Sequence, residues 1–365
     1  MQIKSVELTN FRNYEKEKIY LKDNLNVIIG KNAQGKTNLL ESIFLCCVGK
    51  SFKTNVEKDL IKKDNNFASV KINFSNKTGN VTVSIGLDNN KKFVKLNEIN
   101  LLKISQLLGN LCCVFFSPSE LKLVKDAPDD RRKFINLDLS QINKEYYFNL
   151  IRYNNILKER NKLLKMYDNE KTIKDTLPIW NTQLALVGSK IIKDRLNFIN
   201  KLNAYAHIEH KNLTSNAENL FISYNSFENF ENKSEKEIET SLLNALKSSE
   251  DKDIKLKFTT TGPHRDDLKF SINGFDVKNF GSQGQQRTVA LSIKLAELEI
   301  FKEILNEYPI LLLDDVFSEL DDERQTKLIN RVKSIQTIIT TTNFNYDVSA
   351  NIIEIENAKV INKNV

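Results

Sequence analysis

The sequence is poor in the residues that mark membrane, secreted and metal-binding proteins. Its 365 residues include only 4 cysteines, 5 prolines, 11 glycines and 3 histidines. The cysteines form two adjacent pairs, Cys46/Cys47 and Cys112/Cys113, inside apolar runs, and neither pair is spaced as zinc ligands are. We therefore interpret them as reduced core residues. No apolar run approaches the roughly 20 residues that cross a bilayer, and no secretory leader pattern opens the chain, so we expect a cytoplasmic protein with no membrane partner.

The overall composition indicates a globular protein. Hydrophobic residues make up 40% of the chain and charged residues 28%, which is enough apolar material for a large core. The length favours two domains. With 54 Lys and Arg against 47 Asp and Glu, the net charge of +7 leans mildly towards polyanionic partners.

The hydrophobic pattern changes twice along the chain. Strand patterns dominate the first 125 residues. Helical spacing dominates from 128 to about 203, as two long helices joined around 168–178, and an α/β pattern returns near residue 268. We therefore predict an α/β fold with a head built from both chain ends, residues 1–125 and 255–365, around a mainly helical insertion and connector at 126–254. The predicted elements are strands at 3–8, 25–29, 68–74, 81–87, 92–96, 220–224, 268–272, 310–313 and 337–340, and helices at 36–47, 235–246, 285–303 and 322–333.

The strongest motif is a P-loop between a predicted strand and a predicted helix. Its glycines let backbone N–H groups point at phosphate oxygens, and the following helix adds the positive end of its dipole. Lys36 is expected to contact the β and γ phosphates, and the Thr37 hydroxyl to ligate Mg²⁺. The predicted nucleotide-binding residues of this loop are Gly30, Lys31, Asn32, Ala33, Gln34, Gly35, Lys36 and Thr37.

An acidic pair follows a second apolar strand. The segment YPILLLDD, residues 308–315, places Asp314 and Asp315 at the C-terminal end of a buried strand. Asp314 is the predicted metal ligand, and Asp315 is the predicted catalytic base that polarises or deprotonates the attacking water. The alternative is that the two aspartates cap the following helix.

A third motif, FGSQGQQR at residues 280–287, leads into a helix with an apolar stripe. Serine, glycine and backbone amides at a helix N-terminus form an anion site. A second such site would be redundant for the same ATP, so we predict that it closes on the nucleotide of a partner subunit. The residues predicted to act there in trans are Ser282, Gln283, Gly284 and Gln285. Taken alone, the segment also fits a simple Gly/Ser-rich loop.

In this order, the P-loop, FGSQGQQR, LLLDD and the segment SELD resemble the ABC-type ATPases of the SMC-like DNA-repair group. More narrowly, four further segments resemble the RecF family of bacterial recombination mediators. They are LTNFRNY (8–14), FSPSELKLVKDAPDDRRKF (116–134), LKERNKLLK (157–165) and TGPHRDDL (261–268). The resemblance runs from the N-terminus to about residue 343.

The resemblance implies an ATP- and Mg²⁺-dependent DNA-binding protein whose weak ATPase activity serves as a switch. Such proteins dimerise around ATP, bind duplex DNA near single-strand gaps, and act with RecR and RecO to load RecA in repair, replication restart and the SOS response. Carried over by position, Arg12 would lie near the nucleotide and Asp321 at the dimer interface. The alternative is another ABC-type ATPase, such as a transporter subunit without a DNA role, although the long interval between Lys36 and Ser282 favours an inserted lobe.

Several positions depart from the general pattern or have a structural alternative. ABC-type ATPases carry a glutamine where this chain has Ser117-Pro118 and a histidine near Thr341–Asn343, so hydrolysis is expected to be slow. Asn136 replaces the family's usual aspartate and is given no role. The paired arginines 131 and 132 fit the charged first turn of a helix better than a nucleic-acid contact. None of the three histidines has the Cys/His neighbours of a metal site.

Overall fold

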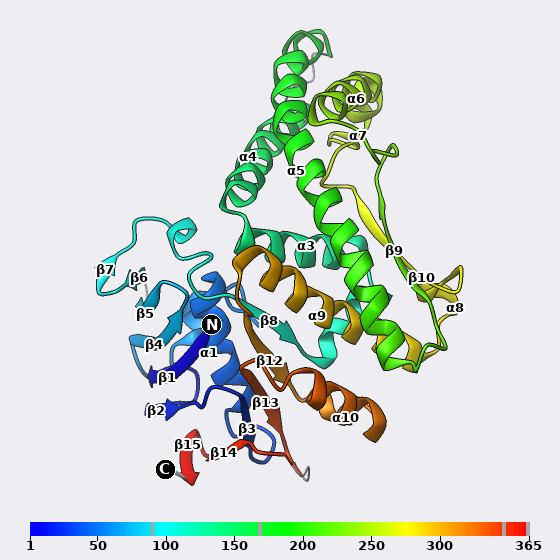
Figure 1. Cartoon of the computed structure of the whole chain (residues 1–365). Helices are drawn as coiled ribbons and strands as arrows, with labels where there is room; N and C mark the ends of the chain where they lie inside the picture. Colours follow the sequence, from blue (N-terminus) through cyan, green and yellow to red (C-terminus); the bar gives the residue numbers. More distant parts are fainter. Residues whose placement is uncertain (89–90, 167–169, 345–347, 363–365) are drawn as a thin grey trace. The chain divides into compact units, whose positions relative to one another are not determined.

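The computed structural model describes residues 1–88, 91–166, 170–344 and 348–362 (Figure 1). These residues form two compact units. Unit 1 contains residues 1–121 and the chain from residue 290 onward, and unit 2 contains residues 122–289. The prediction of an α/β head made from both chain ends around a mainly helical insertion is confirmed. Within the described ranges, no helix combines the length and the apolar character needed to cross a membrane.

A mostly parallel sheet carries the phosphate-loop strand of unit 1. Its strand order is β15-β14-β3-β13-β12-β8, and only β15 runs antiparallel to its neighbour. The strands are β3 (Leu25–Ile29), β8 (Cys113–Phe116), β12 (Ile310–Asp314), β13 (Thr337–Thr341), β14 (Asn351–Glu356) and β15 (Lys359–Asn362). The apolar runs of β8 and β12 are buried, and so is every residue of β13, as expected for parallel strands covered on both faces.

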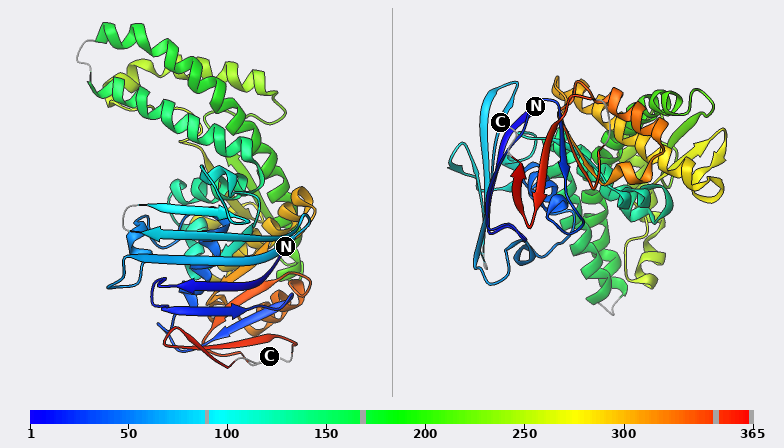
Figure 2. Two further views of the ribbon diagram at one scale, coloured as in Figure 1. Left: turned by 90° about the vertical axis from the view of Figure 1, so that its left-hand side faces the viewer. Right: turned by 90° about the horizontal axis from the view of Figure 1, so that it is seen from below.

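An antiparallel sheet forms the second layer of unit 1 (Figure 2). Its order is β2-β1-β4-β5-β6-β7, with β1 (Gln2–Thr9), β2 (Lys16–Tyr20), β4 (Phe67–Asn76), β5 (Gly79–Asp88), β6 (Lys92–Leu96) and β7 (Ile99–Asn100). Helix α1 (Lys36–Val48) contacts strands of both sheets and is buried along almost its whole length, including both cysteines of its FLCC run. Its second half, residues 43–48, is a continuous apolar run, as expected for a helix segment buried on every side. Helix α10 (Asp322–Arg331) and the part of α9 (Gln283–Leu305) from residue 290 onward complete the unit.

Unit 2 is built on two long helices. Helix α4 (Lys144–Met166) packs against α5 (Glu170–Leu213), and α5 packs against α6 (Glu235–Ser248) (Figure 1). A small antiparallel sheet, β11-β10-β9, adds β9 (Leu220–Asn225), β10 (Asp267–Ile272) and β11 (Phe275–Asp276). The remaining helices are α2 (Lys122–Lys125), α3 (Pro128–Ile142), α7 (Glu250–Leu256) and α8 (Val277–Phe280).

Three of the differences between the structure and the sequence-based expectation concern the architecture. Helix α5 runs through Pro178, which was expected to lie in a joint. The buried side chains of Ile173 and Leu177 pack against α4 and help offset the roughly 3 kcal/mol cost of an internal proline. The first part of the expected joint, residues 168–169, lies outside the described residues.

The second difference is the domain boundary, which was predicted after residue 254. Residues 255–289 group with unit 2 because β10 pairs along its length with β9. Strands β14 and β15 were not predicted at all, and β14 pairs directly with the P-loop strand β3.

Candidate functional site

The P-loop connects β3 to α1 through a turn that requires two glycines. A Cβ on Gly30 would lie 2.4 Å from the carbonyl oxygen of Ile355 in β14, so the loop could not sit this close to that strand with a larger residue. Gly35 has a φ of +111° and is the N-cap residue of α1. The loop is therefore shaped by close backbone approach at one end and by left-handed backbone at the other.

Lys36 lies inside this loop with only 8% of its surface exposed. Its Nζ donates to the carbonyl oxygen of Lys31 at 2.9 Å and to that of Gly30. Burial lowers the pKa of the Lys36 ammonium, and the nearby carboxylates of Asp315 and Asp314 partly offset this. The side chain thus folds back over the loop, with the acidic residues of β12 as its electrostatic partners.

Thr37 and Asp314 meet although they are distant in sequence. The Thr37 hydroxyl donates to Oδ1 of Asp314 at 2.9 Å, and the Thr340 hydroxyl donates to the same oxygen at 2.7 Å. A hydroxyl and a carboxylate oxygen are ligands that suit Mg²⁺, which takes oxygen donors and usually keeps several waters. The donor set predicted from sequence is therefore assembled at one point, and it fits this ion.

Asp315 follows directly on β12 in the left-handed region, with a φ of +54°. Its backbone N–H donates to the Thr340 carbonyl at 3.1 Å, whereas its exposed side chain makes no capping hydrogen bond to the short helical turn 316–319. A strained conformation at a non-glycine residue costs of order 1–3 kcal/mol and is typical of functional sites. The geometry does not support the capping alternative for this residue.

Arg12 is held by a buried carboxylate. Its Nε and Nη2 donate to the two oxygens of Glu41 at 2.9 and 2.7 Å, and the Glu41 side chain is 0% exposed. Its Nη1 donates to the Asp59 carbonyl at 2.8 Å. Because Glu41 lies on α1, this bidentate pair fastens the segment around Arg12 to the helix that the P-loop starts.

The FGSQGQQR segment forms the beginning of α9 in unit 2. Ser282 accepts from the Gln285 N–H at 3.2 Å, while the Gln285 side chain accepts from the Ser282 N–H at 2.9 Å, which is a reciprocal capping arrangement. Ser282, Gln283 and Gly284 are exposed, and the preceding Phe280 is 74% exposed. The motif is thus presented on the surface of its unit at a helix N-terminus.

Asp321 is the N-cap of α10. Its side chain accepts from the Arg324 N–H at 2.9 Å, and this hydrogen bond holds the pKa of Asp321 below its usual range. The side chain is 53% exposed. The cap gives Asp321 a local structural role. Its role at a dimer interface stays a prediction.

Known proteins are similar to this chain in sequence over nearly its whole length. Residues 2–358 match the family described as RecF/RecN/SMC N terminal domain. The DNA replication and repair protein RecF of Clostridium botulinum (strain ATCC 19397 / Type A) is 46% identical over 344 residues, covering 94% of this chain and 93% of that protein. The RecF of Alkaliphilus oremlandii (strain OhILAs) is 47% identical over the same share of both chains. The chain belongs to the RecF family of DNA replication and repair proteins.

Solved structures agree with this membership. The recombination mediator protein RecF in the RecFOR pathway, solved with ATPrS, has a TM-score of 0.91 and 37% identity, covering 98% of this chain and 97% of that one. Its ATP-bound form gives 0.90 at 36% identity, covering 98% and 96%. An Smc head domain from Pyrococcus furiosus gives 0.56 at 19% identity, covering 99% and 96%, and shares the ABC-type head fold.

Several residues of the site in this RecF-family chain were not predicted from sequence. The Tyr14 hydroxyl donates to the Gly35 carbonyl at 3.1 Å, and Asn13 accepts from Asn38 on α1 at 2.9 Å. Lys53 donates to Asn38 at 2.9 Å; burial lowers the pKa of its ammonium, which Glu41 and Asp314 partly offset. The signal for Asn13 and Tyr14 was their place in the LTNFRNY segment, whereas Lys53 has no motif.

The turn between β14 and β15 also supports the P-loop. The Ala358 N–H donates to the Gln34 carbonyl at 3.0 Å, and the Asn357 N–H donates to the Gln34 side chain at 2.5 Å. These residues lie beyond position 343, where the resemblance of the motifs ends. The C-terminal hairpin is therefore part of the site's scaffold.

The polar residues of unit 2 for which no functional role is predicted have structural partners. Arg131 is 4% exposed and pairs with Asp267 at 2.5 Å, which supports the structural interpretation. Asn136 accepts from the Tyr146 hydroxyl at 2.6 Å and from Arg195 at 2.9 Å. His264 contacts the Tyr153 hydroxyl and the Thr259 carbonyl at 2.8 and 3.0 Å, and burial lowers its pKa to about 4. The other two histidines also have hydrogen-bond partners. His207 contacts the Leu220 carbonyl, and His210 contacts the Glu218 side chain.

Proposed function

We propose that this chain is an ATP-driven DNA-binding switch that acts as a recombination mediator. It binds Mg-ATP at the P-loop, two copies close around the nucleotides, and the closed dimer holds duplex DNA near single-strand gaps. The observation that carries the proposal is the hydrogen bond between Thr37 and Asp314, which brings the two predicted metal ligands together beside Lys36. The ATP-bound RecF structures add to this support.

Each residue has a role set by its chemistry. The N–H groups of Gly30–Thr37 and the Lys36 ammonium bind the phosphates, and Arg12 orients the loop through α1. Thr37 and Asp314 would hold Mg²⁺, which when bound neutralises charge on the phosphates. Asp315 accepts a proton from the attacking water at its exposed carboxylate. Without the glutamine and histidine of other ABC-type ATPases, turnover is slow, which suits a switch.

The capped N-terminus of α9 supplies the second half of each nucleotide site from the partner subunit. Its exposed residues Ser282–Gly284 and the neighbouring Phe280 are available to another chain, and Asp321 lies on an exposed N-terminus in unit 1. The RecFOR pathway named for the similar structures supports RecO and RecR as co-acting proteins. RecA as the protein loaded is carried over from the family resemblance. In that role the dimer marks the DNA where loading begins.

The test measures DNA binding and the molecular mass of the protein in the same samples. Labelled duplex, gapped and single-stranded DNA are titrated with the chain, with and without Mg-ATP, while sedimentation records the mass. The proposal predicts ATP-dependent doubling of mass together with duplex binding. Doubling without DNA binding leaves an ABC-type ATPase without a DNA role and contradicts the proposal.

A mixing experiment tests the composite site. Lys36→Met removes the phosphate contact and Ser282→Arg blocks the partner's site, so each variant alone should fail to dimerise with ATP. In a mixture of the two variants, the mixed dimer has one site with an intact P-loop and an intact partner segment. The mixture should therefore recover part of the mass doubling. Lys63→Met, at an exposed lysine outside the loop, is the matched control and should dimerise normally. Loss of ATP binding by the Ser282→Arg monomer would place that segment in its own subunit's site.

A further inference from the structure

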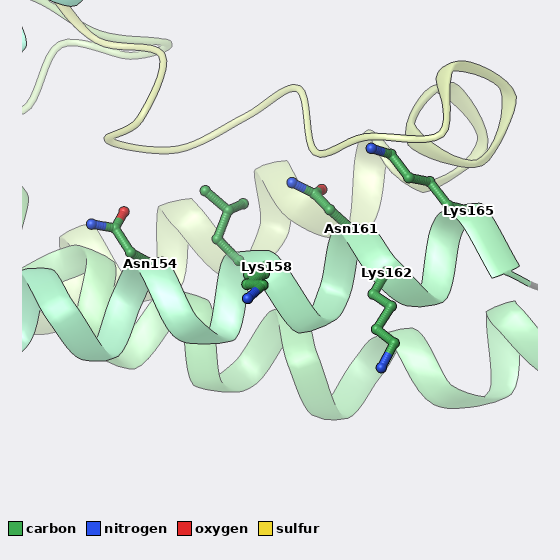
Figure 3. Close-up of a pocket in the computed structure, with 6 residues that line it drawn as sticks. Asn154, Lys158, Asn161, Lys162 and Lys165 are labelled. Carbon is green, nitrogen blue, oxygen red and sulfur yellow. The ribbon is translucent and has the colours of Figure 1, made fainter. Parts of the chain in front are cut away.

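Helix α4 of unit 2 carries an open groove of about 520 Å³ along one side (Figure 3). The groove is rich in long basic and amide side chains and contains no carboxylate among the residues that line it. They are Asn154, Leu157, Lys158, Asn161, Lys162 and Lys165. Because they recur every three or four residues, the polar ones follow one another along the helix surface.

The three lysines of this α4 groove are exposed and have no ion-pair partner within the described part of the chain. By contrast, two other exposed lysines of the same unit have carboxylate partners. Lys174 pairs with Asp251 at 3.0 Å, and Lys236 pairs with Glu239 at 3.2 Å. The groove therefore concentrates uncompensated positive charge, which raises the local concentration of anionic ligands.

The segment after α7 forms a wall beside the groove and is hydrogen-bonded to α4. The Thr259 N–H and hydroxyl both donate to Oδ1 of Asn161, at 2.8 and 2.7 Å. Since Oδ1 is occupied, the amide Nδ2 of Asn161 is left as a donor. The Thr259 hydroxyl also accepts from Nη1 of the fully buried Arg160 at 2.8 Å. The wall is thus anchored to α4 before any ligand arrives.

The same wall presents an aromatic ring with a cation. Phe258 is 37% exposed, and the Arg265 guanidinium lies 4.9 Å from the centre of its ring. Figure 3 shows the wall as a pale yellow segment running along α4, with Asn161 and Lys165 directed towards it and Lys162 directed to the other side. Cationic groups therefore flank the groove on more than one side.

We propose that the α4 groove binds the phosphate backbone of duplex DNA. Lys158 to Lys165 span about 10 Å of helix at 1.5 Å per residue, and one DNA strand presents a phosphate about every 3.4 Å of duplex axis. The length of helix that carries the three lysines thus corresponds to about three phosphate spacings. Lysines and asparagine amides donate to phosphate oxygens without reading bases, so the contact is independent of sequence. This inference rests on the proposed function, which makes DNA a ligand, and it locates the contact.

The test removes the three charges together. In the variant Lys158→Gln/Lys162→Gln/Lys165→Gln, duplex binding with Mg-ATP is measured by fluorescence anisotropy between 50 and 200 mM salt. Each lost phosphate contact lowers the slope of log affinity against log salt by about 0.9, so the slope should become shallower by about 2.7. Affinity at 0.1 M salt should fall by at least about 10-fold. All three residues are exposed, so the fold is expected to be retained.

A matched control loses the same charge elsewhere in unit 2. The variant Lys236→Gln/Lys247→Gln/Lys269→Gln changes three exposed lysines outside the groove and should keep the parent slope. Equal slopes for the groove variant and the parent overturn the inference, as does an equal loss in the control. A groove variant that loses binding to single-stranded DNA but keeps duplex binding also overturns it.

The outcome is separable from the proposed function. If the parent chain binds no DNA under any condition, the proposed DNA role itself fails. If the parent binds duplex, and the groove variant doubles its mass with ATP but binds with the predicted shallower slope, both stand. Mass doubling therefore reports the nucleotide site, and the salt slope reports the groove.

Discussion

Replacing Arg160 by methionine should destabilise unit 2 strongly. Arg160 and Asp253 are both 0% exposed and are paired at 2.8 Å between α4 and α7. Nε of Arg160 also donates to Asn181 on α5 at 3.0 Å, so the guanidinium joins three helices and the segment at Thr259. Methionine fills similar space but leaves the Asp253 carboxylate buried without its cation.

The expected loss in the free energy of unfolding depends on the hydrogen bonds that Asp253 retains. Removing one partner of a buried ion pair typically costs about 3–5 kcal/mol. The Thr260 N–H and hydroxyl still donate to Oδ1 of Asp253, at 2.9 and 2.7 Å, so we expect the low end, about 3 kcal/mol. Adding Asp253→Asn removes the unpaired charge and should restore part of the loss.

The chain provides its own probe for this measurement. Its single tryptophan is Trp180 in α5, packed on a cluster that includes Leu163 of α4, so tryptophan fluorescence reports the unfolding of unit 2. With a urea dependence of about 2 kcal/mol per molar, the unfolding midpoint of the Arg160→Met variant should fall by about 1.5 M. Lys236→Met, which breaks an exposed pair, is the control and should shift it by less than about 0.5 M. A shift for Arg160→Met no larger than the control's would refute the assignment of a buried pair.

Three further predictions concern the site and unit 2. Gly30→Ala puts a Cβ 2.4 Å from the Ile355 carbonyl, and the resulting strain of about 1–3 kcal/mol should weaken ATP binding about 10-fold or more in calorimetric titration; unchanged affinity would contradict the close approach. Asp315→Asn should preserve the ATP dimer but slow phosphate release by roughly 10²–10⁴-fold, and normal turnover would exclude it as the base. Because burial lowers the pKa of His264 to about 4, the unfolded chain takes up its proton first as the pH falls from about 6.5. The free energy of unfolding should thus be highest above pH 6.5 and decline by up to about 3 kcal/mol by pH 4; His264→Asn should lack this part of the decline in urea titrations at pH 7 and 4.5.

The motifs of the proposed nucleotide site could be recognised from sequence because each of them is local. The strand, glycine loop and helix around Gly30–Thr37 are contiguous, so their spacing predicts their geometry. Asp314 was recognisable because an apolar run ending in carboxylates is typical of a buried parallel strand. The meeting of Thr37 with Asp314, 277 positions apart, followed from the chemistry that each motif requires.

The supports of that site depended on tertiary structure alone. Glu41 stands inside an apolar helix with no motif, and only the packing of α1 shows that it is buried and paired with Arg12. Gln34 is held by a hairpin near the C-terminus. The same is true away from the site in unit 2, where Arg160 pairs with Asp253 across 93 positions. A lone polar residue in sequence is indistinguishable from a surface residue. Its partner is decided by how distant segments pack, since a buried charge must find the opposite group wherever the fold brings one close.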